Sequence, residues 1–196
     1  MPNGTLLQLD DAGPKPHLYF SSGSGEFRFS SDAITHTYKY TKRLAHIMDQ
    51  MPAAEVDEFY FATSTIGGYT IFPSNRAKGA MTINGARGCN YKICDRFDLT
   101  LECIRLYYLG IDSPLTSTLV QYVSFFDLFD DFRGYVDFFL LNDLVTDNHN
   151  SVRFYMPFGG FETWPLPKSV AAYRSYRDGV LEFVTARNQR IEDSLC

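Results

Sequence analysis

The sequence predicts an α+β fold in which an antiparallel β-meander forms a single layer of sheet, with several α-helices packed on one face. Two observations favour it. Short apolar runs punctuated by glycine, proline and asparagine fill the first half of the chain, and runs with helical periodicity fill the second. No internal repeat or linker divides the 196 residues, so we expect a single globular domain over residues 1–196.

The N-terminal segment favours edge strands. Apolar runs lie at Leu6–Leu9, Leu18–Phe20 and Glu26–Phe29, and the Ser/Gly tract Ser21–Gly25 is typical of a hairpin turn. We therefore expect two or three strands before residue 30.

A helix is predicted next, from a cap at Ser31 or Asp32 to about Gln50, with Pro52 after its end. Gly67-Gly68 suits a tight hairpin between two strands, since glycine tolerates positive φ. The predicted meander consists of three strands: Val56–Thr63, Tyr69–Phe72 and Ala80–Ile83.

The clearest helix is Asp95–Leu109. Its apolar residues lie within about 60° of one another on a helical wheel; they are Phe97, Leu101, Ile104 and Tyr108. Gly110 follows as a C′ glycine would.

Helical patterns continue to the C-terminus. Ser113-Pro114 supplies a cap and an N1 proline for a helix with a buried stripe at Leu119, Tyr122, Phe126 and Phe129. Gly134–Val145 favours helix over strand, and Val152–Met156 is predicted as a strand. A last helix runs from Ser169 to about Glu192, with one side formed by Tyr173, Tyr176, Val180, Val184 and Arg187.

The net charge of −5 conceals a local asymmetry. Between Arg76 and Arg105 there are six basic and three acidic residues, whereas residues 112–151 hold seven aspartates and one arginine. Internal complementarity between two packed segments explains this pattern better than a basic face does. The overall charge argues against nucleic-acid binding.

The cysteine spacing indicates no structural zinc site, because Cys89, Cys94, Cys103 and Cys196 include no C-x-x-C pair. The N-terminus lacks the pattern of a signal peptide, and no apolar run is long enough to span a membrane. We expect a reducing cytoplasmic location and no membrane partner.

The candidate site follows from the predicted meander. In that arrangement the Gly67-Gly68 turn, the loop Asn84–Ile93 and the helix starting at Asp95 lie at one end of the sheet. Backbone donors, a helix N-terminus and cations are the components of anion sites. The candidate ligand-binding residues are Thr65, Gly67, Gly68, Asn84, Arg87, Asn90, Lys92 and Arg96.

Within this set, Arg87 and Lys92 are candidate anion contacts, and Asn84 and Asn90 are candidate orienting groups. The loop carries neither a Rossmann nor a P-loop fingerprint. The structural alternative is that the glycines and asparagines form turns and that Arg87 pairs with an acid. No cofactor is indicated.

Two further hypotheses remain open. Asp95, Asp98 and Glu102 could hold a divalent metal for a phosphoryl-transfer enzyme or nuclease, or could pair with neighbouring arginines. Trp164, in a Gly/Pro-rich loop, or the acidic segment 112–151 could meet a protein partner. The sequence does not decide whether the protein is an enzyme.

The stretches TIGGYTIFPSNR, MTINGARGCN and DRFDLTLECIRLYY, followed by FFDLFDDFRGYVDFFLLNDLV and ARNQRI, resemble a DUF6994-like family of uncharacterised bacterial and phage proteins. The resemblance spans most of the chain. It implies a compact bacterial domain and brings no activity, cofactor or catalytic residue. It also implies an N-terminal segment in relatives before the part matching Pro2-Asn3-Gly4.

The leading interpretation is therefore a cytoplasmic bacterial domain that binds a small anionic or nucleotide-like ligand at the end of the sheet formed by Gly67 and Asn84–Lys92. The alternative is a protein–protein interaction module in a phage- or defence-related system. The metal-dependent enzyme is third.

Overall fold

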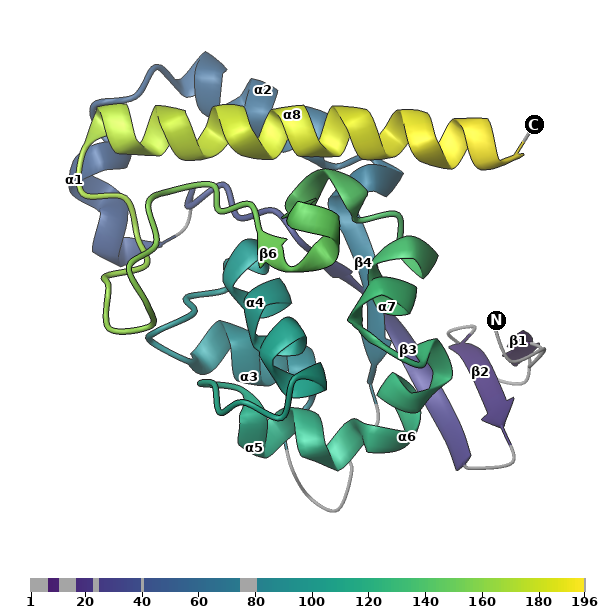
Figure 1. Cartoon of the computed structure of the whole chain (residues 1–196). Coiled ribbons are helices and arrows are strands. Elements are labelled where there is room, and N and C mark those ends of the chain that lie inside the picture. Colours follow the sequence, from purple (N-terminus) through teal and green to yellow (C-terminus); the bar gives the residue numbers. More distant parts are fainter. Residues whose placement is uncertain (1–6, 11–16, 23–24, 40, 75–80, 196) are drawn as a thin grey trace.

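The computed structural model describes residues 7–10, 17–22, 25–39, 41–74 and 81–195. The α+β fold is confirmed: an antiparallel sheet lies beside a larger helical part, and the longest helix crosses over both (Figure 1). The strand order is β1-β2-β3-β4. The strands are β1 Leu7–Asp10, β2 His17–Ser22, β3 Gly25–Ala33 and β4 Tyr69–Pro73.

The sheet buries one face along most of the β3–β4 pair. Asp32 lies opposite Thr70, and both are buried together with Phe72. The neighbouring pair, Ala33 and Tyr69, faces the other way and is exposed. This alternation agrees with the predicted single layer, because only a face covered by helices needs to be apolar or fully paired.

The N-terminal strands were predicted, and the middle one of the three predicted meander strands is β4. The strand prediction for Val56–Thr63 is wrong, because this segment lies in helix α2, Ala53–Thr63. Val56, Phe59 and Thr63 are buried at a spacing of three and four residues, which is helical. The bulky side chains of this segment favour strands, but the packing of one face decided the structure.

The third predicted strand, Ala80–Ile83, is also wrong over the described residues 81–83. Helix α3, Ile83–Cys89, begins there. Thr82 caps it, because its hydroxyl accepts a hydrogen bond from the Gly85 amide at 3.1 Å. Ala80 lies outside the described residues. The sheet is therefore built from N-terminal strands and β4 rather than from the predicted meander.

The predicted helix from Ser31 to Gln50 is only partly present. Ser31 and Asp32 belong to β3, where they pair with β4. Helical structure starts later, in the 3-10 helix η1, Lys42–Leu44, and helix α1, Ala45–Met48. The residues predicted to cap a helix thus lie in a strand, and the described residues 34–39 and 41 between β3 and η1 are not helical.

Gly67 and Gly68 do not form a hairpin turn. They end the 3-10 helix η2, Ile66–Gly68, which connects α2 to β4. A Cβ atom on Gly68 would collide with the backbone carbonyl oxygen of Thr63, and one on Gly67 would lie 2.7 Å from the carbonyl oxygen of Val184. Close backbone approach, not positive φ, is the reason for glycine here.

Helix α4, Phe97–Tyr108, confirms the clearest helix prediction. Gly110 has a φ of 69° and donates to Tyr107, while Ile111 donates to Leu106 at 2.9 Å. These two bonds form the Schellman motif expected after the helix.

The segment after α4 is a series of short helices, where two helices were predicted, one after Ser113-Pro114 and one over Gly134–Val145. Its described elements are α5 Thr116–Leu119, η3 Val120–Tyr122, α6 Val123–Phe126, η4 Asp127–Phe129, α7 Phe132–Phe138, η5 Asn142–Leu144, β5 Val145–Thr146, η6 Asp147–His149 and β6 Ser151–Val152. The predicted apolar stripe is nonetheless buried. Phe126, Phe129 and Tyr135 pack ring against ring, with centroids 5.3–6.0 Å apart. The strand predicted at Val152–Met156 is reduced to β6.

Helix α8, Val170–Leu195, confirms the last predicted helix and its buried side. It lies along α2 and η2, as Figure 1 shows. Arg187 connects α8 to its neighbours, because its guanidinium donates to the carbonyl oxygens of Phe139 and Gly67 at 3.0 and 2.9 Å.

Candidate functional site

A cavity of about 480 Å³ lies between two segments that are far apart in the sequence. One wall comes from His36, Thr41 and η1, and the other from the end of α3 and the loop that leads to α4. Leu166 completes it. The lining residues are His36, Thr41, Lys42, Arg43, Gly88, Cys89, Asn90, Tyr91, Cys94, Asp95 and Leu166.

The loop wall is held by its own hydrogen bonds. The Cys94 amide donates to the Asn90 carbonyl at 2.7 Å, and the Asn90 side chain accepts from the Lys92 amide at 2.9 Å. Cys94 and Asp95 have φ values of 47° and 64°, in the left-handed region. Two adjacent non-glycine residues in this region are a strained arrangement that the surrounding bonds maintain.

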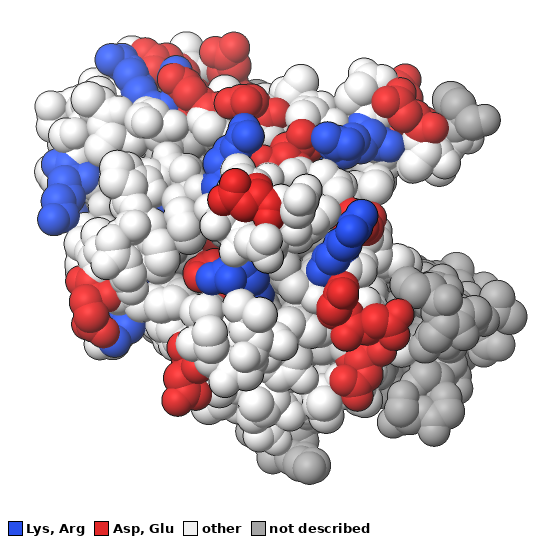
Figure 2. All heavy atoms as spheres, in the orientation of Figure 1, with Lys and Arg blue, Asp and Glu red and all other residues white. Residues whose placement is uncertain are grey.

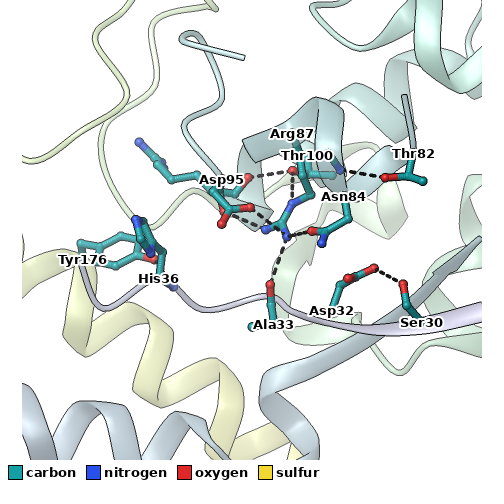
Figure 3. Close-up of polar contacts among 12 residues, drawn as sticks. Ser30, Asp32, Ala33, His36, Thr82, Asn84, Arg87, Asp95, Thr100 and Tyr176 are labelled. Atoms are coloured by element: carbon teal, nitrogen blue, oxygen red, sulfur yellow. Dashed lines mark hydrogen bonds and ion pairs between the residues drawn. The ribbon is translucent and has the colours of Figure 1, made fainter. Parts of the chain in front are cut away.

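Arg87 organises the base of this wall (Figure 3). Its side chain is buried and donates to Thr100 Oγ1, to the Ala33 carbonyl and to Asn84 Oδ1 at 3.2, 3.0 and 3.2 Å. A fourth bond reaches the Asp95 carbonyl at 2.7 Å. Arg87 therefore connects β3, α3 and α4, and the sequence alternative, in which Arg87 pairs with an acid, is present as well.

The acid is Asp95. Its Oδ1 lies 3.0 Å from Arg87 Nη1, but the pair lacks hydrogen-bond alignment. A second carboxylate, Asp32, lies on the buried face of β3 beside this network and accepts from Ser30 at 3.2 Å. Burial raises the pKa of Asp32, and the charge of Arg87 opposes part of that rise.

The opposite wall carries the cations. Lys42 and Arg43 are adjacent and exposed at the cavity, and within the described part of the chain neither side chain has an ion-pair partner. His36 lies beside them, with its Nε2 3.0 Å from Thr41 Oγ1. Burial lowers the pKa of His36, so the ring is neutral at neutral pH. The cavity therefore carries two positive charges on one side.

The thiol of Cys94 is not arranged as a nucleophile. It donates to the Tyr91 carbonyl at 3.2 Å, and burial raises its pKa above the ordinary thiol value, an effect that the charge of Arg43 only partly offsets.

Of the predicted ligand-binding residues, Asn90 alone lines this cavity. Asn84 and Arg87 lie behind its wall in the buried network. Lys92 forms an ion pair with Glu162, and Arg96 is buried against Asp98 and donates to the Pro165 carbonyl at 2.9 Å.

Thr65, Gly67 and Gly68 do not line it. They face α8, where Asn188 donates to Thr65 Oγ1 and accepts from the Gly67 amide, each at 2.8 Å. Gly68 accepts from the Ile34 amide at 3.0 Å. Gly67 and Gly68 thus lie where η2 packs against α8 and against the end of β3, and this region is separate from the cavity.

The three acids named as a possible metal set do not converge. Asp95 pairs with Arg87, Asp98 with Arg96, and Glu102 with Arg105 at 2.7 Å. Among the described residues, no three His, Cys, Asp or Glu side chains lie together so that they could hold a metal ion.

The sequence reasoning missed the η1 wall. Residues 31–50 were predicted as one helix, and neither Lys42 nor Arg43 was among the candidate site residues. The available signal was the adjacent pair of basic residues directly after Thr41, in a segment whose apolar face was irregular.

The two hypotheses of a protein partner, at Trp164 and at the acidic segment 112–151, stay predictions. Trp164 is 43 % exposed, in the loop whose Pro165 carbonyl binds Arg96. Figure 2 shows acidic and basic side chains interspersed over one face of the molecule, in agreement with local pairing rather than a basic binding face.

The comparisons with known proteins add a family and no activity. A family model described as a family of unknown function, DUF6994, matches residues 1–191. Comparison with curated proteins and with solved structures found no match. Within the described residues, every helix is too short or too polar to cross a membrane.

Proposed function

The chain belongs to the DUF6994 family of unknown function, and we propose that it binds a small anionic organic molecule, of the nucleotide or sugar-phosphate class, in the cavity between η1 and the loop Gly88–Asp95. The observation that carries this proposal is the pair Lys42 and Arg43. Two adjacent cations at the rim of a cavity, without ion-pair partners among the described residues, attract an anion from solution.

The size and lining of the cavity support the same ligand class. A volume of about 480 Å³ lies within the range of small-molecule sites, roughly 300–1,000 Å³. Tyr91 is exposed at the rim and Leu166 lies in the lining, so a ring can pack there while a phosphate or carboxylate meets the cations.

A thermal-shift screen against nucleotides, sugar phosphates and divalent metals tests the proposal. A ligand at 100 times its Kd stabilises the fold by about 2.7 kcal/mol, which is readily measured. We expect a shift with phosphate-bearing compounds that disappears in the double variant Lys42→Glu/Arg43→Glu.

The matched control is Arg133→Glu/Arg153→Glu, which changes the net charge equally. Both arginines are exposed and lie outside the cavity. Equal shifts in the two double variants, or no shift with any compound, would contradict the proposed function.

A second candidate function, protein–protein interaction, is favoured by a different observation. Phe61 is 71 % and Ile66 is 66 % exposed, and Tyr60 and Tyr69 nearby in the sequence are also exposed. Large apolar side chains gathered on a surface mark partner sites. Pull-down with the wild-type protein and with the variant Phe61→Ser/Ile66→Ser tests this function. A protein that the wild type captures and the variant does not capture supports it. Equal capture by both contradicts it.

A further inference from the structure

Two cysteines of this chain line the same cavity. Cys89 is the last residue of helix α3, and Cys94 lies in the loop that leads from α3 to α4. Both are free thiols; Cys89 is exposed and Cys94 is half-buried. The third described cysteine, Cys103, is buried in α4 and does not line the cavity. The cavity thus holds a pair of thiols that the proposed anion site does not use.

The backbone brings these two cysteines close together. At the end of α3 the Arg87 carbonyl accepts a hydrogen bond from the Asp95 amide at 3.1 Å, so the chain returns to the end of the helix after the loop. In a continuous helix the same carbonyl would accept from the amide of Tyr91, whose nitrogen would lie about 4.4 Å from the Cα atom of Cys89. The Asp95 nitrogen takes that place, and the Cα atom of Cys94 is about 2.4 Å from it. The two cysteine Cα atoms therefore lie within about 7 Å of each other.

This separation suits a disulfide, because the Cα atoms of bridged cysteines are usually about 4.4–6.8 Å apart. The residues between the two cysteines already form a closed turn. The amides of Ile93 and Cys94 both donate to the Asn90 carbonyl, at 3.1 and 2.7 Å. A bond between the thiols would close this turn covalently with little movement of the backbone.

The two thiols differ in their access to solvent. Cys89 is exposed, so it can meet an oxidant in solution. Lys42 and Arg43 line the same cavity and attract an anionic oxidant such as glutathione disulfide. The Cys94 thiol instead donates to the Tyr91 carbonyl at 3.2 Å, and burial raises its pKa. Cys89 is therefore the thiol that reacts first.

We propose that Cys89 and Cys94 form a reversible disulfide by exchange with a small-molecule disulfide, and that this bond closes the loop at the wall of the cavity. In the first step the Cys89 sulfur attacks one sulfur of glutathione disulfide, which gives a mixed disulfide and releases one glutathione that carries the Cys89 proton. In the second step the Cys94 sulfur attacks the Cys89 sulfur, and the Cys94 proton leaves with the second glutathione. Two protein thiols are oxidised, and one disulfide is reduced to two thiols.

The second step needs no activated thiol. Cys94 attacks a sulfur on a neighbouring part of the same chain, and the high effective concentration of an intramolecular reactant compensates for its low acidity. An excess of reduced glutathione reverses both steps.

Peptide mapping of the full chain tests the proposal. Trypsin cleaves after Lys92, between the two cysteines, so a disulfide joins the peptides of residues 88–92 and 93–96. The protein is incubated with glutathione disulfide, its remaining thiols are blocked, and it is then digested. We expect the linked peptides as the main product, with two reduced glutathione molecules released per chain and Cys103 still reduced. Excess reduced glutathione should restore the separate peptides.

Three serine variants, each checked by thermal unfolding, identify the role of each thiol. Cys94→Ser should stop at a stable mixed disulfide on Cys89, and Cys89→Ser should leave Cys94 as a free thiol. Cys196→Ser is the control and should give the linked peptides as the wild-type protein does.

Three outcomes would overturn the proposal: a wild-type protein that stays reduced, one that stops at the mixed disulfide on Cys89, and one that links Cys89 to Cys103 or Cys196 instead. None of them depends on whether the cavity binds a phosphate compound, so this test and the test of the proposed function can fail separately.

Discussion

Three buried arginines, Arg87, Arg96 and Arg187, are held in different ways. Arg96 pairs with the buried Asp98, and Arg87 combines a carboxylate with carbonyl, amide and hydroxyl acceptors. Among the described residues Arg187 has carbonyl partners and no carboxylate. Burial without a carboxylate lowers the pKa of Arg187 to about 10, which still leaves it charged at neutral pH. The hydrogen bonds of Arg187 connect α8 to η2 and to the end of α7.

Replacing Arg187 with lysine should destabilise the protein by about 2–4 kcal/mol, because an ammonium group cannot reach the same set of carbonyls and leaves at least one of them buried without a donor. Urea unfolding of Arg187→Lys measures this. Arg174→Lys is the control, since Arg174 forms an exposed pair with Glu55 and should cost less than about 1 kcal/mol. Equal effects would show that Arg187 has no special structural role.

The buried carboxyl group of Asp32 should make the free energy of unfolding depend on pH. Its pKa is raised above 3.8 by burial, so the folded state favours the protonated form. The stability it contributes is present below the unfolded pKa and is lost as the pH rises through the folded pKa. At pH 7, Asp32→Asn should therefore unfold at a higher urea concentration than the wild-type protein.

The gap between the two proteins should narrow as the pH falls toward 4. Unfolding curves at several pH values between 7 and 4 test the sign, and a wild-type protein that is the more stable at pH 7 would refute this reading of the buried carboxylate.

Helices with long periodic patterns were predictable, whereas α2 and the short helices were not. Helices α4 and α8 follow from apolar spacing over several turns and from Gly110 as an end signal. Helix α2 was mistaken for a strand because eleven residues rich in large side chains carry only a weak helical pattern. The η1 segment was misread because Ser31 and Asp32 resemble a helix cap, whereas their pairing with β4 involves residues about forty positions later.

The candidate site inherits these errors. The glycine, asparagine and basic residues of Asn84–Ile93 were predicted as a loop, but residues 84–89 lie in helix α3, and only the part after it is a loop. The opposite wall of the cavity was not predicted, because no local pattern specifies that His36 and Thr41–Arg43 lie across from this segment.

The junction at Gly68 supplies a matched pair of glycine substitutions. Gly68→Ala places a Cβ against the Thr63 carbonyl and should cost several kcal/mol or prevent folding, as expected for a backbone clash. Gly88→Ala, in helix α3, meets nothing within 4 Å and should stabilise by up to about 1 kcal/mol. Thermal unfolding of both proteins tests it, and the same sign for both would contradict the packing described for η2.

In the whole molecule, the cavity is lined by parts of the chain that are far apart in the sequence. Its lining comes from His36 and Thr41–Arg43, from residues between Gly88 and Asp95, and from Leu166 in the loop before α8. A ligand there would hold all three together. Binding should therefore raise the stability of the entire domain and not only of one loop, which is why unfolding measurements report on it.

The affinity for an anion should rise as the pH falls. His36 lines the cavity with a lowered pKa, so below pH 6.5 its protonation adds a third positive charge to the wall that carries Lys42 and Arg43. Sulfate is the suitable probe, because it does not titrate in this range. We expect tighter sulfate binding at pH 5.5 than at pH 7.5 in the wild-type protein, and a weaker dependence in His36→Gln. An identical pH dependence of sulfate binding in the variant would show that His36 does not contribute to the anion site.

The most direct test of the anion site is amide chemical-shift mapping of the 22.4 kDa protein titrated with inorganic phosphate. We predict shifts concentrated at residues 36–43 and 88–95, absent in Lys42→Glu/Arg43→Glu and retained in Arg133→Glu/Arg153→Glu. Shifts that cluster around Gly67 and Gly68 instead, or that persist when both cavity cations are reversed, would contradict a binding site between η1 and the Asp95 loop.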